Sequence, residues 1–145
     1  MNQLTQVLSM AQAVRSALIK INSTSVTSHL RGHQNESLLF LCAQASTILA
    51  EQLRLSNIEA VIKTCHFSPT PTKESYANHS VVVWNGQIID ITASQYNSRA
   101  AHFPEVVVCA INNPLYNNLT DPDFTAWPED QRPSAQVTAA VLASL

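Results

Sequence analysis

Charge is scarce in this chain of 145 residues, because only 12% of them are Asp, Glu, Lys or Arg, about half the usual share of roughly a quarter. The formal net charge is -2, and no cluster of Lys and Arg supplies the phosphate contacts that a nucleic acid needs. We therefore expect no nucleic-acid partner.

Long apolar runs are also missing. No stretch reaches the roughly 20 apolar residues of a membrane-spanning helix, so we expect no membrane partner. The N-terminal sequence MNQLTQVLSMAQAVRSALIKI lacks the charged start and unbroken apolar run of a secretion signal. We expect a protein made in the cytoplasm, whose delivery into another cell, if it occurs, follows a non-Sec route.

Cysteine is too rare for a disulfide scaffold, which needs several pairs in a short chain. The three cysteines are Cys42, Cys65 and Cys109. A metal site is disfavoured as well, because the pair His29 and His33 encloses a glycine and lacks the glutamate of a zinc protease motif. The neighbours Cys65 and His66 would point to opposite faces of a strand. The sequence predicts no metal and no cofactor.

Hydrophobic residues make up 46% of the chain, enough for one core in a single domain spanning 1–145. Some segments of the chain have apolar residues at helical spacing, and others have the β-branched runs typical of strands. The predicted helices are 3–21, 37–55 and 134–145, and the predicted strands are 58–67, 79–84, 87–92 and 104–111. Helices followed by consecutive strands favour an α+β fold, with the helix 37–55 packed centrally on an antiparallel sheet.

Two further segments differ in character. The continuous apolar run in 104–111 predicts a strand buried on both faces. The following segment 112–133 is rich in Asn, Asp and Pro, which predicts irregular structure. We expect Tyr116, Phe124 and Trp127 to anchor it to the body of the protein.

The strongest local signal is a β-hairpin around Asn85 and Gly86, because this dipeptide suits a type I′ turn with positive φ at both positions. That turn pairs Val81 with Asp90. Val81 and His79 point to the same face, so His79 and Asp90 are diagonal neighbours, about 7 to 8 Å apart between Cα atoms. An imidazole there can bridge the carboxylate and an incoming thiol.

Cys42 is the candidate thiol, because a cysteine nucleophile needs an imidazole to take its proton and that imidazole needs a polar partner. If the helix begins at Ser37, Cys42 lies in its second turn. If 38–41 form an irregular lead-in, Cys42 lies at the helix N-terminus, where the partial positive charge favours a thiolate.

The segments CAQASTILAEQLRLSNIEAVI and HSVVVWNGQIIDITASQY resemble the bacterial branch of the papain-like and transglutaminase-like cysteine enzymes, over about residues 32–111. The resemblance implies a papain-like or transglutaminase-like fold, in which Cys42 is the nucleophile, His79 the general base and Asp90 its orienting partner. The papain-type oxyanion glutamine, six residues before the cysteine, is replaced by Glu36. Gln34 and Asn35 are the nearby oxyanion candidates.

These residues predict a cysteine-dependent acyl-transfer enzyme that acts on an amide of glutamine or of a peptide bond through a thioester. A protein or peptide substrate is the expected partner, and a deamidase or transglutaminase-like effector or toxin is the favoured class. A cysteine protease is one alternative. The other is a non-catalytic binding or chaperone-like module, with Cys42 as core packing and Asp90 as a structural acid that accepts hydrogen bonds from the next turn.

Overall fold

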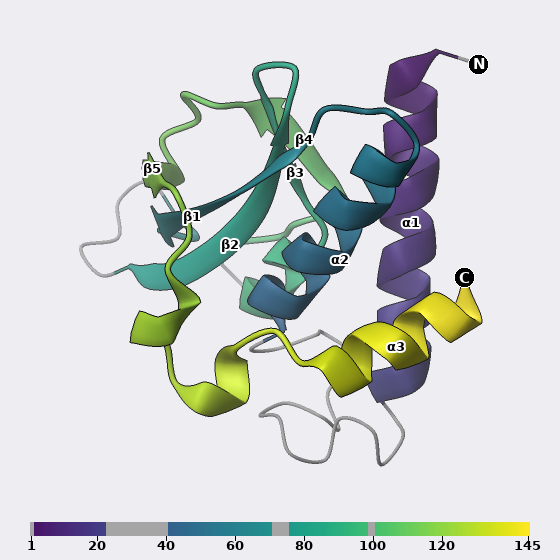
Figure 1. The fold of residues 1–145 in the computed structure, drawn as a ribbon. Coiled ribbons are helices and arrows are strands. Elements are labelled where there is room, and N and C mark those ends of the chain that lie inside the picture. Colours follow the sequence, from purple (N-terminus) through teal and green to yellow (C-terminus); the bar gives the residue numbers. More distant parts are fainter. Residues whose placement is uncertain (1, 23–40, 71–75, 99–100) are drawn as a thin grey trace.

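The computed structural model describes residues 2–22, 41–70, 76–98 and 101–145. This part of the chain folds into three α-helices that cover one face of a five-stranded antiparallel sheet (Figure 1). The α+β prediction is confirmed at that level. The elements are α1 (Gln3–Asn22), α2 (Cys42–Leu55), β1 (Val61–Phe67), β2 (Ala77–Trp84), β3 (Gln87–Asp90), β4 (Val107–Ala110), β5 (Tyr116–Thr120) and α3 (Ala135–Ser144). None of the helices in these ranges combines the length and hydrophobicity needed to cross a membrane.

The sheet has the strand order β4-β3-β2-β1-β5, so the predicted hairpin of β2 and β3 lies at its centre. Val82 pairs with Ile89 and Trp84 with Gln87, which is the register that a two-residue Asn85-Gly86 turn dictates. The predicted register is therefore confirmed. Because side chains alternate across a strand, this register decides which residues share a face with His79.

Helix α2 begins at Cys42, with Leu41 as its N-cap residue. The prediction of a start at Ser37 was wrong, and the arrangement with Cys42 at the helix N-terminus is the one observed. The helix ends as predicted, at Ser56 and Asn57. Asn57 takes a positive φ of 62°, and the Ile58 N–H donates back to the Leu53 carbonyl at 2.9 Å, a C-terminal motif that left-handed Asn permits. The backbone N–H of Ile58 is engaged in this cap and cannot pair with another strand. Strand β1 therefore starts at Val61, and the predicted start at residue 58 was wrong.

Two predictions about the later strands were wrong. Strand β4 is not buried on both faces, because it lies at the edge of the sheet with β3 as its one partner, and Val107, Val108 and Cys109 are only half-buried. The segment 112–133 is not wholly irregular, because β5 pairs with β1. The Asn-rich sequence of β5 has no alternating apolar pattern, and its strand conformation depends on the partner β1 supplies.

The sheet separates two apolar clusters. The larger one joins the three helices to one face of the hairpin, where Val82, Trp84 and Ile89 point toward the helices. The smaller one lies on the other face and contains Phe67 and Tyr116. His79 and Val81 alternate with Val82, so they point to this second face. The His79 side of the candidate site thus lies buried among the apolar and aromatic side chains of this second face.

The hairpin turn provides a test of what fixes this register. Gly86 has φ +71°, and a Cβ built on it would meet no atom within 4 Å, so any cost of a side chain there is conformational. We expect Gly86→Ala to lower the free energy of unfolding by about 1 kcal/mol, measured by urea denaturation. Asn85→Gly, at a neighbouring φ of 51°, should cost far less. Equal stability of Gly86→Ala and the parent protein would contradict this explanation.

Candidate active site

His79 and Asp90 form a buried pair. The imidazole Nε2 lies 2.7 Å from the carboxylate Oδ2 of Asp90, and the two residues are 0% and 1% exposed. They come from adjacent strands of the hairpin, as diagonal neighbours on one face. The contact predicted from the turn register is therefore present.

Asp90 is held by hydrogen bonds from three residues. Besides His79, its Oδ2 accepts from the Tyr116 hydroxyl at 2.8 Å, and its Oδ1 accepts from the Thr92 N–H at 3.0 Å. Burial by itself would raise the pKa of Asp90, but the charge of His79 and these hydrogen bonds together lower it below its usual value. By accepting this bond from Thr92, Asp90 also caps the following turn, as expected of a structural acid. Asp90 therefore fixes the local backbone as well as the imidazole.

Burial alone would lower the pKa of His79, because desolvation disfavours the charged ring. The Asp90 carboxylate, through its charge and its hydrogen bond, outweighs burial and raises the pKa of His79 to about 10, with a smaller contribution from Cys42. Nε2 is taken by Asp90, and the buried Nδ1 has no hydrogen-bond partner among the described residues. Nδ1 is therefore the nitrogen left to exchange a proton with another group.

Cys42 stands at the head of α2, where the first backbone N–H groups of a helix have no partner in the preceding turn. The thiol is buried, with 4% of the residue exposed. At neutral pH the site therefore holds a carboxylate and an imidazolium next to this thiol. Such a cation favours the thiolate form of a neighbouring cysteine, which is the nucleophilic form.

Aromatic rings surround the imidazole. The ring centroids of Phe67, Tyr96 and Tyr116 lie 5.0, 5.4 and 6.4 Å from that of His79. Phe67 is central to this group and also packs on Tyr96 and Phe103, at 5.0 and 5.5 Å. These contacts fix the plane of the imidazole and keep water from the bond between His79 and Asp90, which strengthens that interaction.

A buried arginine supports the same hairpin from the helical side. Arg15 of α1 is 5% exposed, and its Nη1 donates to the Ile91 carbonyl at 2.6 Å, one residue after Asp90. Burial lowers the pKa of Arg15, opposed by the charges of Glu105 and Asp90. Arg15 thus ties α1 to the backbone that follows the carboxylate and places a positive charge in its vicinity.

The sequence pattern missed several of these contacts. Tyr116 was expected to anchor its segment, and it is buried at 3% exposure, but its bond to Asp90 had no signal in a polar run. Phe124 and Trp127 are half-buried and pack on each other at 5.2 Å. Arg15 lies 75 positions before Asp90, and only folding brings the two residues together.

The oxyanion candidates Gln34 and Asn35 lie outside the described residues, as do His29 and His33. Within the described ranges, no group of three or more His, Cys, Asp or Glu side chains is arranged to hold a metal ion.

Searches of protein-family models, curated proteins and solved structures find no match to this chain. The interpretation of the site therefore depends on its own geometry.

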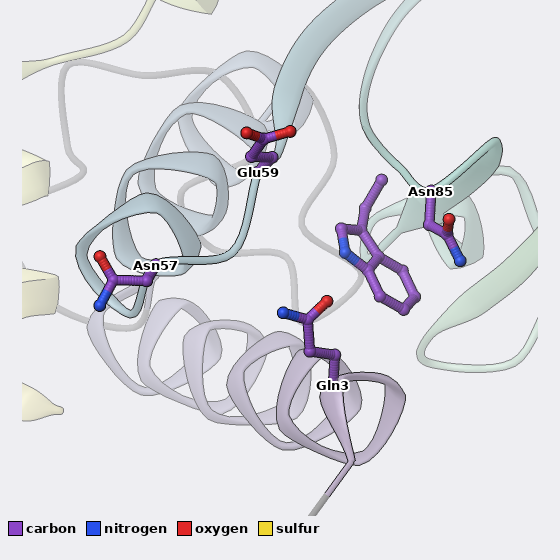
Figure 2. Close-up of a pocket in the computed structure, with 5 residues that line it drawn as sticks. Gln3, Asn57, Glu59 and Asn85 are labelled. Carbon is purple, nitrogen blue, oxygen red and sulfur yellow. The ribbon is translucent and has the colours of Figure 1, made fainter.

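A separate pocket of about 440 Å³ lies at the other end of β2. Figure 2 shows its lining, in which side chains from the start of α1, the segment after α2 and the hairpin turn surround the cavity. The lining residues are Gln3, Asn57, Glu59, Trp84 and Asn85. It contains none of the candidate catalytic residues. Five residues of strand, about 17 Å, separate Trp84 from His79, so the two sites are distinct.

Proposed function

We propose that this chain is a cysteine-dependent acyl-transfer enzyme with a papain-like or transglutaminase-like fold, acting on the amide of a glutamine side chain or of a peptide bond. The observation that carries the proposal is the buried pair of His79 and Asp90 at 2.7 Å, which leaves the imidazole Nδ1 without a hydrogen-bond partner among the described residues. A carboxylate that fixes one imidazole nitrogen leaves the other to exchange a proton with the nucleophile.

Each residue then has a role in the reaction. The Cys42 sulfur forms a bond to the carbonyl carbon, and the carbonyl π electrons move to oxygen. When the tetrahedral intermediate collapses, the C–N bond breaks and protonated His79 gives its Nδ1 proton to the leaving ammonia or amine. Water or a second amine, losing a proton to the same imidazole, then cleaves the thioester. Asp90 holds the imidazole in position throughout.

A protein or peptide is the proposed substrate. Hydrolysis of the thioester gives deamidation, attack by an amine gives transamidation, and release of a peptide amine gives proteolysis. We favour a glutamine deamidase or transglutaminase-like effector or toxin. A cysteine protease is the second possibility.

A non-catalytic binding module is the rival function, and the burial of the site favours it. Cys42 is 4% exposed and His79 is 0% exposed, so a substrate reaches the thiol only if neighbouring groups move. A thiol that never meets a substrate would serve packing alone.

Capture of the thioester distinguishes these functions. We expect a glutamine-containing peptide, incubated with the protein and a fluorescent primary amine, to gain the amine or to convert Gln to Glu, with both products identified by mass spectrometry. Cys42→Ala should reduce the rate at least about 1,000-fold, because it removes the nucleophile. The matched control Cys109→Ala, on edge strand β4, should retain it.

Two results would count against the proposal. If neither glutamine peptides nor activated esters modify Cys42, the binding-module alternative is supported. Peptide cleavage that depends on Cys42, without amine incorporation or Gln to Glu conversion, would instead identify a protease.

A further inference from the structure

Acyl transfer through a thioester places negative charge on the carbonyl oxygen of the tetrahedral intermediate, and this charge needs hydrogen-bond donors. The backbone N–H of Cys42, at the start of α2, is one donor that the fold supplies. A side chain beside the imidazole can supply a second donor.

Tyr96 has the required position. It ends the short 3-10 helix Ala93–Tyr96, which directly follows the turn held by Asp90. Its ring stands edge-on to the imidazole of His79, at 5.4 Å between centroids and an interplanar angle of 76°. On another side it packs on Phe67 at 5.0 Å. The ring is therefore fixed against the imidazole that faces Cys42.

The hydroxyl of Tyr96 is available to a substrate. Among the described residues it has no hydrogen-bond partner, whereas the hydroxyl of Tyr116 is already engaged by Asp90 at 2.8 Å. Tyr96 is half-buried, unlike Tyr116 at 3% exposure. Burial first, and then the charge of Cys42, raise the pKa of Tyr96, so the phenol keeps its proton and remains a donor at any working pH.

We propose that Tyr96 is a further catalytic residue, whose hydroxyl donates a hydrogen bond to the carbonyl oxygen as it becomes negatively charged. This inference rests on the proposed acyl-transfer function. The phenol keeps its proton throughout. The oxygen gains an electron pair when the sulfur bonds to carbon and returns it when the amine leaves, so Tyr96 stabilises the intermediate without a net proton transfer.

Two reactions of the same thiol separate this role from a structural one. Acylation of Cys42 by a chromogenic acetate ester passes through an oxyanion, whereas alkylation by iodoacetamide does not. In Tyr96→Phe, which keeps the packed ring, we expect ester acylation to fall about 100-fold, as for the loss of one oxyanion donor. Alkylation should stay within about twofold of the parent protein. The control Tyr76→Phe, at a tyrosine that is 56% exposed and stacked on His66, should change neither rate.

Each result decides between the hypotheses. If the parent protein is acylated on Cys42 and Tyr96→Phe reacts equally fast, Tyr96 is not an oxyanion donor, although the proposed function stands. If acylation and alkylation fall together in Tyr96→Phe, its role is to position the thiol or imidazole, and the inference is wrong. If the parent protein is not acylated at all, the proposed function fails and this inference fails with it.

Discussion

Replacement of His79 by glutamine should slow the alkylation of Cys42 by iodoacetamide at pH 6.5 by about 10- to 100-fold. An ordinary thiol, with a pKa near 8.5, is only about 1% ionised at that pH. In the parent protein, His79 carries a positive charge because its pKa is raised to about 10, and a cation beside a cysteine favours nucleophilic attack by its sulfur. The rate is measured by mass spectrometry of the modified cysteine peptide.

The pH profile gives this prediction its specificity. The ratio of the parent rate to the His79→Gln rate should be largest at pH 6.5, where the imidazole is charged, and should approach one near pH 10, where the imidazole loses its proton. Glutamine is chosen because it can still donate to Asp90, which limits damage to the fold. His66→Gln is the matched control, because His66 lies on the same sheet, stacked on Tyr76 at 3.9 Å.

The other cysteines provide an internal standard in the same experiment. Burial raises the pKa of Cys65 and of Cys109, so both should react slowly at pH 6.5. Rapid alkylation of Cys42 with an unchanged rate in His79→Gln would mean that the imidazole does not activate the thiol. The enzyme proposal would then lose its main support.

Removal of the Asp90 carboxylate should produce the largest loss of stability in the protein. Asp90→Ala leaves the His79 imidazole, the Tyr116 hydroxyl and the Thr92 N–H without their buried partner. Breaking a buried ion pair from one side costs about 3 to 5 kcal/mol, so we expect a loss of that size in urea denaturation at pH 6.5. Asp90→Asn preserves the shape and should lose less.

Asp121→Ala is the control for the loss of a carboxylate as such. Asp121 pairs with Lys63 at 2.6 Å, but its side chain is 89% exposed, and exposed pairs contribute little because water screens them. Its removal should leave the urea midpoint nearly unchanged. If Asp90→Ala behaves like Asp121→Ala, the buried pair does not hold the hairpin together.

The same pair makes stability depend on pH in a defined direction. Folding raises the pKa of His79 from 6.5 to about 10, so its stabilising contribution is complete below pH 6.5 and is lost as pH rises toward 10. Folding lowers the pKa of Asp90 from 3.8, so that contribution is present above 3.8 and is lost as pH falls further. We expect the pair to stabilise the fold most between about pH 4 and 6.5. The decline between pH 6.5 and 10 should be smaller in Asp90→Asn.

Much of this site follows from local sequence. The Asn85-Gly86 turn sets the register of the hairpin. Because side chains alternate between the two faces of a strand, this register determines which of them share a face. That alone predicts the contact of His79 with Asp90. The polar pair Ser56 and Asn57 likewise marks the end of α2.

The same reasoning fails where an element takes its conformation from a neighbour. Strand β5 has no apolar alternation and exists because β1 offers it an edge for pairing. The apolar run of β4 looks like a central strand, but its position at the sheet edge leaves it half-buried. The local sequence encodes neither the pairing of β5 with β1 nor the edge position of β4.

The sequence by itself determined the helix that carries Cys42, the hairpin that joins His79 to Asp90, and the face they share, because turn chemistry and periodicity act over a few residues. Only the tertiary structure decided that α2 begins at Cys42, that Tyr116 and Arg15 support the Asp90 region, and that Tyr96 stands beside the imidazole. These contacts join residues between 17 and 76 positions apart, across separate elements. They arise when burial of the two apolar clusters brings those elements together, and no local pattern specifies them.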